Sequence, residues 1–185
     1  KTRASQFIKM KSDDATVVTV EYLPAAPTGT LILITQHGYG LRYDLSEVPT
    51  IGAKAVGVKS MDLRDDAIVR ATIAADDDLI AMITQRGSFK KMKVADLPVT
   101  SRARRGVQVL RELKNNPHRV ADYVLVTSDA NGVALDVLTD RGKHHSILND
   151  DHPTSARYSN GSFVVDTDTE GEPVSMQIHP IPLTV

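Results

Sequence analysis

The chain contains no cysteine, which removes disulfide bridges, thiol nucleophiles and thiolate metal sites from its possible chemistry. The absence of cysteine fits a reducing compartment. No apolar run approaches the roughly 20 residues that a membrane-spanning helix needs. The first residues, KTRASQFIKMK, also lack the apolar centre of a signal peptide. We therefore expect a soluble, cytoplasmic protein with no membrane partner.

The sequence also lacks the local motifs of common enzymes. It has no phosphate-binding loop, no GxSxG nucleophile elbow and no dinucleotide fingerprint. The acidic groups Asp65, Asp66 and Asp76–Asp78 lie between strand-like runs, where carboxylates usually solvate turns. His144 and His145 are adjacent, and neighbours on a strand point to opposite faces, so they would need a bulge to share one metal ion. We expect no catalytic residue, no metal site and no cofactor in this chain.

Positive charge is concentrated in the middle of a chain whose formal net charge is only -1. Residues 86–119 include ten basic and two acidic residues, whereas residues 120–185 include three basic and ten acidic ones. A surface rich in Lys and Arg attracts phosphate groups, and the planar guanidinium of Arg binds them with two parallel hydrogen bonds. This pattern indicates a nucleic-acid partner. The alternative is a solvated face whose lysines prevent edge-to-edge aggregation.

Three internal repeats indicate the architecture. TQHG (35–38) recurs as TQRG (84–87) and TDRG (139–142), and a second glycine follows each of these motifs at the same distance of nineteen residues. We expect the glycines to occupy equivalent backbone positions where positive φ or a close approach excludes a side chain. These structural glycines are Gly38, Gly57, Gly87, Gly106, Gly142 and Gly161.

The local pattern within each repeat indicates strands. Apolar residues alternate in YGLRYDL (39–45), as in a half-buried strand, and each TxxG lies between strand-like runs, as in a tight hairpin. Proline interrupts the helix-like stretches SEVPT (46–50) and VADLPV (94–99). The predicted fold is all-β, with four-stranded blades arranged radially as in a propeller. We expect one domain over residues 1–185, with about three complete blades at 28–74, 78–127 and 132–185 and a half blade at 1–22.

Several stretches resemble a known family. SEVPTIGAKAVGVKSMDLRDD (46–66), TSRARRGVQVLRELKNNPHRV (100–120) and SNGSF (159–163) are similar to consecutive blades of the C-terminal domain of ParC, the A subunit of bacterial topoisomerase IV in its Gram-positive form. The related gyrase A subunit has a QRRGGKG-type box, for which SRARRG (101–106) is a degenerate counterpart here, and this favours the ParC type. The resemblance implies a β-pinwheel disc whose basic rim binds double-stranded DNA and orients the transported duplex.

The basic residues of the repeats are the predicted DNA-binding residues. Repeats stacked around an axis place equivalent positions along one rim, and phosphate contacts along a rim position DNA without reading its sequence. The predicted residues are Arg42, Lys54, Arg86, Lys90, Lys91, Lys93, Arg102, Arg104, Arg105, Arg111, Lys114, Arg119 and Arg157.

The resemblance also implies partners and limits. The partners would be the remainder of the A subunit and the ATPase B subunit, in a nucleoid-associated enzyme that uses ATP and Mg²⁺ for decatenation and relaxation. None of the five tyrosines lies beside a carboxylate cluster as a DNA-cleaving tyrosine would, so we expect the isolated chain to bind DNA without cutting it. Two alternatives remain open, namely a propeller-like scaffold for protein partners and a gyrase-type domain that wraps DNA.

Overall fold

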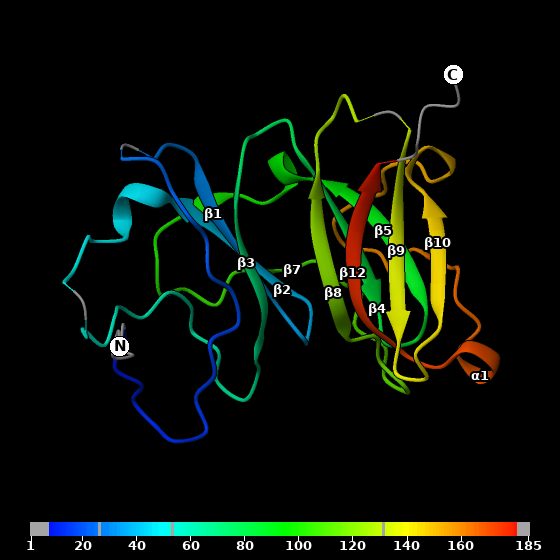
Figure 1. The fold of residues 1–185 in the computed structure, drawn as a ribbon, viewed down its shortest axis with the longest axis horizontal. Helices are drawn as coiled ribbons and strands as arrows, with labels where there is room; N and C mark the ends of the chain where they lie inside the picture. Colours follow the sequence, from blue (N-terminus) through cyan, green and yellow to red (C-terminus); the bar gives the residue numbers. More distant parts are fainter. Residues whose placement is uncertain (1–7, 26, 53, 131, 181–185) are drawn as a thin grey trace, which may run out of the picture.

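The computed structural model describes residues 8–25, 27–52, 54–130 and 132–180, and its strands form three sheets that stand side by side (Figure 1). The first sheet is ordered β3-β1-β2, and two short strands pair with the outer edge of β2. The strands of this sheet are β1 (Thr30–Thr35), β2 (Tyr39–Asp44), β3 (Ile68–Ala74), β6 (Val99–Thr100) and β7 (Val107–Gln108).

The second sheet is ordered β11-β5-β4-β8 and the third is ordered β10-β9-β12. Their strands are β4 (Leu79–Thr84), β5 (Ser88–Lys93), β8 (Val120–Val126), β9 (Val133–Thr139), β10 (His144–Leu148), β11 (Ser162–Phe163) and β12 (Pro173–Pro180). The described residues contain little helix: three 3-10 turns and one turn of α-helix, which are η1 (Leu45–Glu47), η2 (Val94–Asp96), η3 (Asn149–Asp151) and α1 (Thr167–Glu170). In the described ranges, no helix has the length and apolar character needed to cross a bilayer.

The outermost strands of the first two sheets come from the following repeat. Strands β6 and β7 belong to the second repeat but pair with β2, where Gly40 lies opposite Val107. In the same way β11, from the third repeat, pairs with β5, where Phe89 lies opposite Ser162. The sheets are therefore interlocked as well as packed against each other. The predicted all-β fold of propeller-like blades is confirmed.

Two apolar layers hold the three sheets together. On β4, Ile80 and Met82 face the first sheet, while Ala81 and Ile83 face the third, so both faces of the second sheet are buried. The alternation in residues 39–45 led us to expect a strand with one solvated face, and this prediction is wrong because β2 is also covered on both sides. Burial on both faces is the consequence of placing each blade between two neighbours.

Each TxxG motif forms the same hairpin turn. The threonine carbonyl accepts a hydrogen bond from the glycine N–H, over 3.0, 2.9 and 2.9 Å in the three repeats. The threonine hydroxyl accepts a second hydrogen bond from the main-chain N–H four residues later, over 3.0, 3.2 and 3.2 Å. The turn requires positive φ at its glycine, and φ is 78°, 76° and 72° at Gly38, Gly87 and Gly142.

Residues 8–25 contain no strand. They run as extended coil past the first sheet, where the Thr19 hydroxyl accepts a hydrogen bond from Ala71 N at 3.4 Å and Lys9 N donates to Ala55 O at 3.2 Å. Residues 1–7 of the predicted half blade lie outside the described residues, as do residues 181–185 of the third predicted blade.

Candidate nucleic-acid interface

Two loops at equivalent positions of the second and third repeats lie on the outer edge of the sheets. We call residues 101–106 the first rim loop and residues 156–161 the second rim loop. In the first, Arg102 Nη1 donates to Lys59 O at 2.6 Å, and in the second Arg157 Nη1 donates to Gln108 O. Lys59 and Gln108 each lie two residues after the second glycine of their repeat. Each loop is therefore bound to the segment that follows the preceding loop, and the loops form a series along the rim.

The glycine at the end of each rim loop lies against the backbone of the preceding blade. Gly106 and Gly161 have φ of 84° and 72°. A Cβ atom on Gly106 would overlap the carbonyl oxygen of Gly40, and one on Gly161 would overlap that of Phe89. Gly57 also has a positive φ of 86°, but among the described residues no atom lies within 4 Å of the place of a Cβ on it. The close approach at Gly106 and Gly161 lets the outermost strand pair with the neighbouring blade.

The first rim loop presents several arginines. The guanidinium of Arg105 lies 4.0 Å from the ring centre of Tyr39 and donates to Leu63 O at 2.9 Å. Arg104 is exposed, and its Nε donates to the Ser101 hydroxyl at 3.3 Å. Arg105 donates one N–H to a carbonyl and keeps its positive charge and its other N–H donors, so it can still bind phosphate.

The structure adds two cations that the sequence analysis missed. Lys59 and Arg64 lie on the segment against which the first rim loop packs, and both contact Asp62, at 2.8 and 3.7 Å. The hydrogen bond and positive charge of Lys59 lower the pKa of Asp62. The only signal in the sequence was their place just after Gly57, in a stretch of mixed charge. We call the five basic residues gathered here the rim cluster: Lys59, Arg64, Arg102, Arg104 and Arg105.

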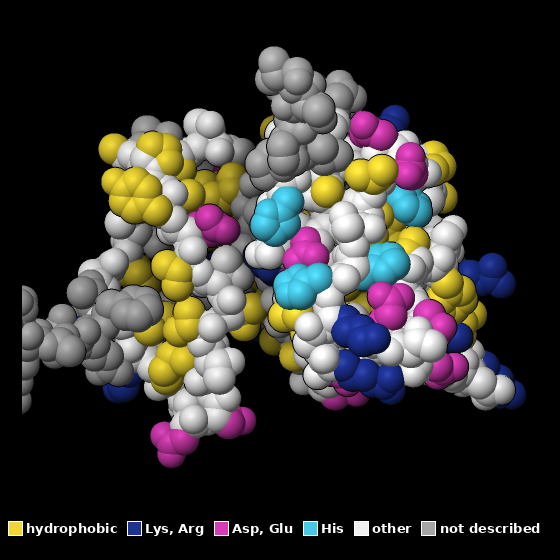
Figure 2. Space-filling model, turned by 45° about the vertical axis from the view of Figure 1, so that its right-hand side comes forward, with side chains coloured by type: hydrophobic (Ala, Val, Ile, Leu, Met, Phe, Trp, Pro, Cys, Tyr) yellow, Lys and Arg dark blue, Asp and Glu magenta, His cyan; other side chains and the backbone are white. Residues whose placement is uncertain are grey.

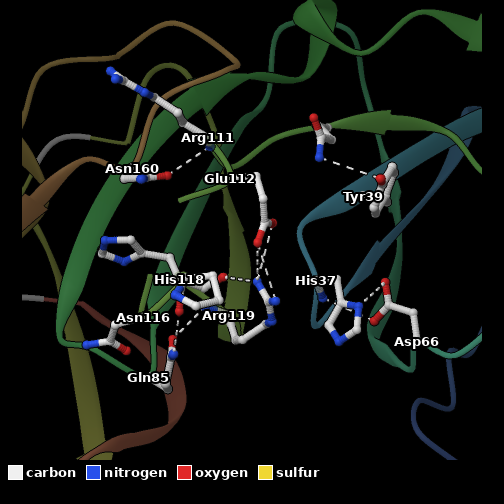
Figure 3. Close-up of polar contacts among 12 residues, drawn as sticks. His37, Tyr39, Asp66, Gln85, Arg111, Glu112, Asn116, His118, Arg119 and Asn160 are labelled. Atoms are coloured by element: carbon white, nitrogen blue, oxygen red, sulfur yellow. Dashed lines mark hydrogen bonds and ion pairs between the residues drawn. The ribbon is translucent and has the colours of Figure 1, made fainter. Parts of the chain in front are cut away.

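A second group of cations lies on the loop of residues 110–119, at the hairpin end of the sheets. The ends of this loop are fixed to the first hairpin, because Val109 N donates to Gly38 O at 2.7 Å and Val120 N donates to Gln36 O at 2.8 Å. Within the loop, Arg119 faces Glu112 at 3.4 Å, as Figure 3 shows.

The remaining predicted cations near this loop differ in their exposure and in their contacts. Arg111 and Lys114 are exposed, and the main-chain N–H of Arg111 donates to Asn160 Oδ1 at 2.8 Å. Arg86 donates to Asn116 O at 2.8 Å and lies 5.5 Å from the ring centre of Phe163. The predicted residues Lys54 and Lys93 are exposed at other points of the first two repeats.

Three of the predicted DNA-binding cations are buried. Arg42, Lys90 and Lys91 are 3%, 2% and 6% exposed. Arg42 Nη1 donates to Val94 O at 3.3 Å, and Lys91 Nζ donates to Asn149 O at 2.6 Å. Val94 and Asn149 each begin the 3-10 turn of the following repeat, so these cations connect one blade to the next. Since a phosphate could not reach them without opening the blades, we leave all three out of the proposed DNA surface.

The loops on either side of residues 110–119 are acidic. The corresponding loop of the first repeat contains Asp62, Asp65 and Asp66, and that of the third contains α1 with Asp168 and Glu170. The exposed face of the third sheet has histidine and carboxylate side chains side by side (Figure 2). At the hairpin end of the sheets, positive charge is therefore concentrated on the loop of the second repeat.

His144 and His145 contact different partners. His144 Nδ1 lies 2.7 Å from Asp136 Oδ2, and His145 Nδ1 lies 3.0 Å from Glu170 Oε2. The two rings are thus held by separate carboxylates. Within the described residues, no three His, Cys, Asp or Glu side chains are grouped so that they could hold a metal ion.

Comparison with known proteins identifies the family. The family model described as DNA gyrase C-terminal domain, beta-propeller, matches residues 29–76 and 78–122. The A subunit of DNA topoisomerase 4 from Streptococcus pneumoniae is 35% identical over 184 residues, which cover 93% of this chain and 22% of the relative. Its counterpart from Staphylococcus aureus is 40% identical over 149 residues, which cover 80% of this chain and 18% of the relative. The chain thus spans about a fifth of the length of these curated relatives.

Solved structures agree with this result. The crystal structure of the C-terminal domain of DNA topoisomerase IV has a TM-score of 0.77 and 39% identity, and the match covers 82% of this chain and 47% of that one. A gyrase A C-terminal domain has a TM-score of 0.76 at 15% identity, with 93% and 57% of the two chains covered, and this likeness shows the fold alone. The resemblance seen in the sequence is confirmed: the chain belongs to the family of C-terminal β-propeller domains of the gyrase and topoisomerase IV A subunits.

Proposed function

We propose that this chain is a DNA-binding domain of a topoisomerase IV A subunit, which binds the transported duplex without sequence specificity and orients it during decatenation and relaxation. The observation that carries the proposal is the rim cluster, where five cations from two consecutive repeats lie on one outer edge. Guanidinium and ammonium groups along one edge can follow a phosphate backbone, and contacts to phosphates do not read the base sequence.

The proposed partners follow from family membership. The chain would act together with the remainder of its A subunit and with the ATPase B subunit, in a cytoplasmic, nucleoid-associated enzyme. ATP and Mg²⁺ would be used by the parent enzyme and not by this chain. DNA wrapping of the gyrase type has less support, because the acidic loops of the first and third repeats interrupt the positive surface.

Salt dependence of DNA binding tests the proposal. The triple variant Lys59→Ala, Arg64→Ala, Arg104→Ala removes three exposed charges without removing a side chain that donates to a main-chain carbonyl. Each phosphate contact contributes about 0.9 to the slope of log affinity against log salt, so we expect the slope to decrease in magnitude by about 2 to 3. Affinity for unrelated duplexes should fall by similar factors.

A matched control uses cations of the third repeat. Arg141 and Lys143 are exposed on its hairpin, outside the rim cluster and beside the acidic α1. Replacing both with alanine lowers the net charge but should leave the slope nearly unchanged. If the control variant loses as much slope per removed charge as the rim variant, binding depends on net charge alone and the proposed surface is wrong. If the wild-type chain has no salt-dependent DNA affinity, the proposed function itself is wrong.

A further inference from the structure

The two rim loops share a course but are held by different bonds. The first rim loop is bound to the preceding repeat by main-chain hydrogen bonds: Ala103 N donates to Ser60 O at 2.8 Å, and Asp62 N donates to Arg104 O at 2.9 Å. Ser60 lies three residues after Gly57, and Arg104 lies two residues before Gly106. At the second rim loop, the equivalent of Ser60 is Val109, three residues after Gly106, and the equivalent of Arg104 is Ser159, two residues before Gly161.

Both equivalent carbonyls bind the side chain of Lys90 instead. Lys90 Nζ lies 2.9 Å from Val109 O and 3.1 Å from Ser159 O. The same ammonium also lies 3.2 Å from Ala156 O and 2.7 Å from Arg157 O. One buried cation therefore takes the place of the two main-chain bonds seen in the first rim loop and binds two further carbonyls of the second.

The surroundings of Lys90 account for this arrangement. The side chain comes from β5 and is 2% exposed, and an ammonium removed from water must be compensated by hydrogen bonds. It has three N–H donors for the four carbonyl oxygens around it, so one donor is shared. Leu41 occupies the equivalent position of the first repeat and packs in an apolar cluster with Tyr43 and Met61. The cation is thus particular to the junction between the second and third blades.

We propose that Lys90 is a positioning residue that holds the second rim loop, and with it Arg157 and Tyr158, on the rim. The consequence for DNA binding rests on the proposed function; the positioning itself does not. Because Ala156, Arg157 and Ser159 turn their carbonyls inward to the ammonium, the loop directs its negative dipole ends away from the surface. Tyr158 is then 48% exposed, and Arg157, whose Nη1 donates to Gln108 O, adds its charge next to the end of the first rim loop, so both can extend the positive surface.

Trypsin cleavage after Arg157 measures the positioning without DNA. The variant Lys90→Leu installs the residue of the first repeat and leaves four carbonyls without their charged donor, so the second rim loop should open. A lost charged hydrogen bond corresponds to a change of about tenfold or more, and we expect cleavage after Arg157 to accelerate at least that much. Cleavage after Arg104 in the first rim loop should keep its rate, because that loop is held by main-chain bonds.

Two further variants separate positioning from general loss of folding or charge. Lys143→Leu removes one exposed positive charge and should leave both cleavage rates unchanged. Lys90→Gln retains two N–H donors and should give an intermediate rate after Arg157. In Lys90→Ala, added propylammonium should restore slow cleavage, whereas propanol, which lacks the charge, should not. The proposal is overturned if cleavage after Arg157 is unchanged in Lys90→Leu, or if cleavage after Arg104 accelerates as much as cleavage after Arg157.

DNA affinity provides the second measurement. Lys90→Leu should bind duplex DNA about threefold to tenfold more weakly than Lys143→Leu, although both lose one charge. Adding Tyr158→Ala to Lys90→Leu should cause little further loss, because the loop that presents the tyrosine is already displaced. A wild-type chain that does not bind DNA would refute the proposed function and leave the trypsin result standing. A Lys90→Leu chain that is cleaved rapidly yet binds DNA as Lys143→Leu does would show that the second rim loop is not part of the DNA surface.

Discussion

Replacing Gly106 with alanine should destabilise the fold far more than the same change at Gly57. Both glycines end the same segment of their repeats and have nearly equal φ, of 84° and 86°. They differ in surroundings: a Cβ atom on Gly106 would overlap the carbonyl oxygen of Gly40, whereas a Cβ on Gly57 would have no atom of the described residues within 4 Å. The pair therefore separates the cost of the backbone conformation from the cost of the close approach.

The expected magnitudes follow from this difference. An alanine in the left-handed region costs about 1 to 2 kcal/mol at either position. At Gly106 the alanine must also move β7 away from β2, which breaks the pairing of Val107 with Gly40 and of Gln108 with Tyr39. Two main-chain hydrogen bonds at about 1 kcal/mol each, with about 1 kcal/mol for the stacking of Arg105 on Tyr39, add roughly 3 kcal/mol. We expect losses of about 4 kcal/mol for Gly106→Ala and about 1 kcal/mol for Gly57→Ala.

Urea denaturation of both variants, followed by circular dichroism, provides the measurement. The transition midpoints should separate widely, while the dependence of the unfolding free energy on urea should stay that of the wild type if only the native state is affected. Equal losses at the two positions would mean that the carbonyl of Gly40 yields without cost. That result would refute the argument that the close approach of Gly106 holds the exchanged strand on the preceding blade.

Two further outcomes concern buried charges. Asp122, 5% exposed on β8, accepts hydrogen bonds from Arg70 Nη2 and from Met176 N, each at 2.9 Å, and so connects the inner strands of all three sheets. Asp122→Ala should lower the free energy of unfolding by about 3 kcal/mol, and Asp122→Asn by less, as chemical denaturation would measure. Burial, with a smaller contribution from the charge of Arg157, lowers the pKa of Lys90 from 10.5 to about 8. Between these two pH values the unfolded chain binds more protons at this site than the folded chain, so the free energy of unfolding of the wild type relative to Lys90→Met should rise from pH 8 to pH 10.5. Urea titrations at several pH values would measure this difference. A flat or falling difference would contradict the lowered pKa.

The hairpins and the all-β class could be predicted because their determinants are local. In Thr35–Gly38 the turn is set by one hydroxyl, one carbonyl and one glycine within a few residues, and the motif recurs wherever those residues recur. Apolar alternation located β2, whose observed bounds differ from the prediction by a single residue at its end. The spacing of the second glycine likewise located the rim loops.

The partners of the outermost strands could not be predicted in the same way. The pairing of Val107 with Gly40 and of Ser162 with Phe89 joins segments that are far apart in sequence, and neither short strand has a pattern that names its partner. The repeats predicted positive φ or a close approach at Gly106, but they did not identify the Gly40 carbonyl as the group that it approaches. Strand exchange between repeats depends on long-range packing, which composition and periodicity do not encode.

The role of a shared repeat position could not be derived either. Arg42 and Lys91 occupy equivalent positions, and a common place on a basic rim was a reasonable interpretation. The repeat is real, but these side chains point between blades, to Val94 O and to Asn149 O. A strand that is buried on both faces has no solvated side on which to display a charge. A cation at such a position binds a carbonyl of the next blade. Periodicity alone cannot distinguish this internal contact from a contact to an external phosphate.

The distribution of charge over equivalent positions limits the path of a bound duplex. At the hairpin end, the loop of residues 110–119 presents Arg111 and Lys114, while the corresponding loop of the third repeat presents Asp166 and Asp168. A duplex lying across that end would place its phosphates over carboxylates, and like charges at close range oppose binding. Along the outer edge, Asp62 is paired with Lys59 and Arg64 of the rim cluster, and the second rim loop follows the cluster without a further acidic loop between them. We therefore expect a duplex to lie along the rim of the first two blades as a short arc, a geometry that orients a DNA segment and does not require it to bend around the whole disc.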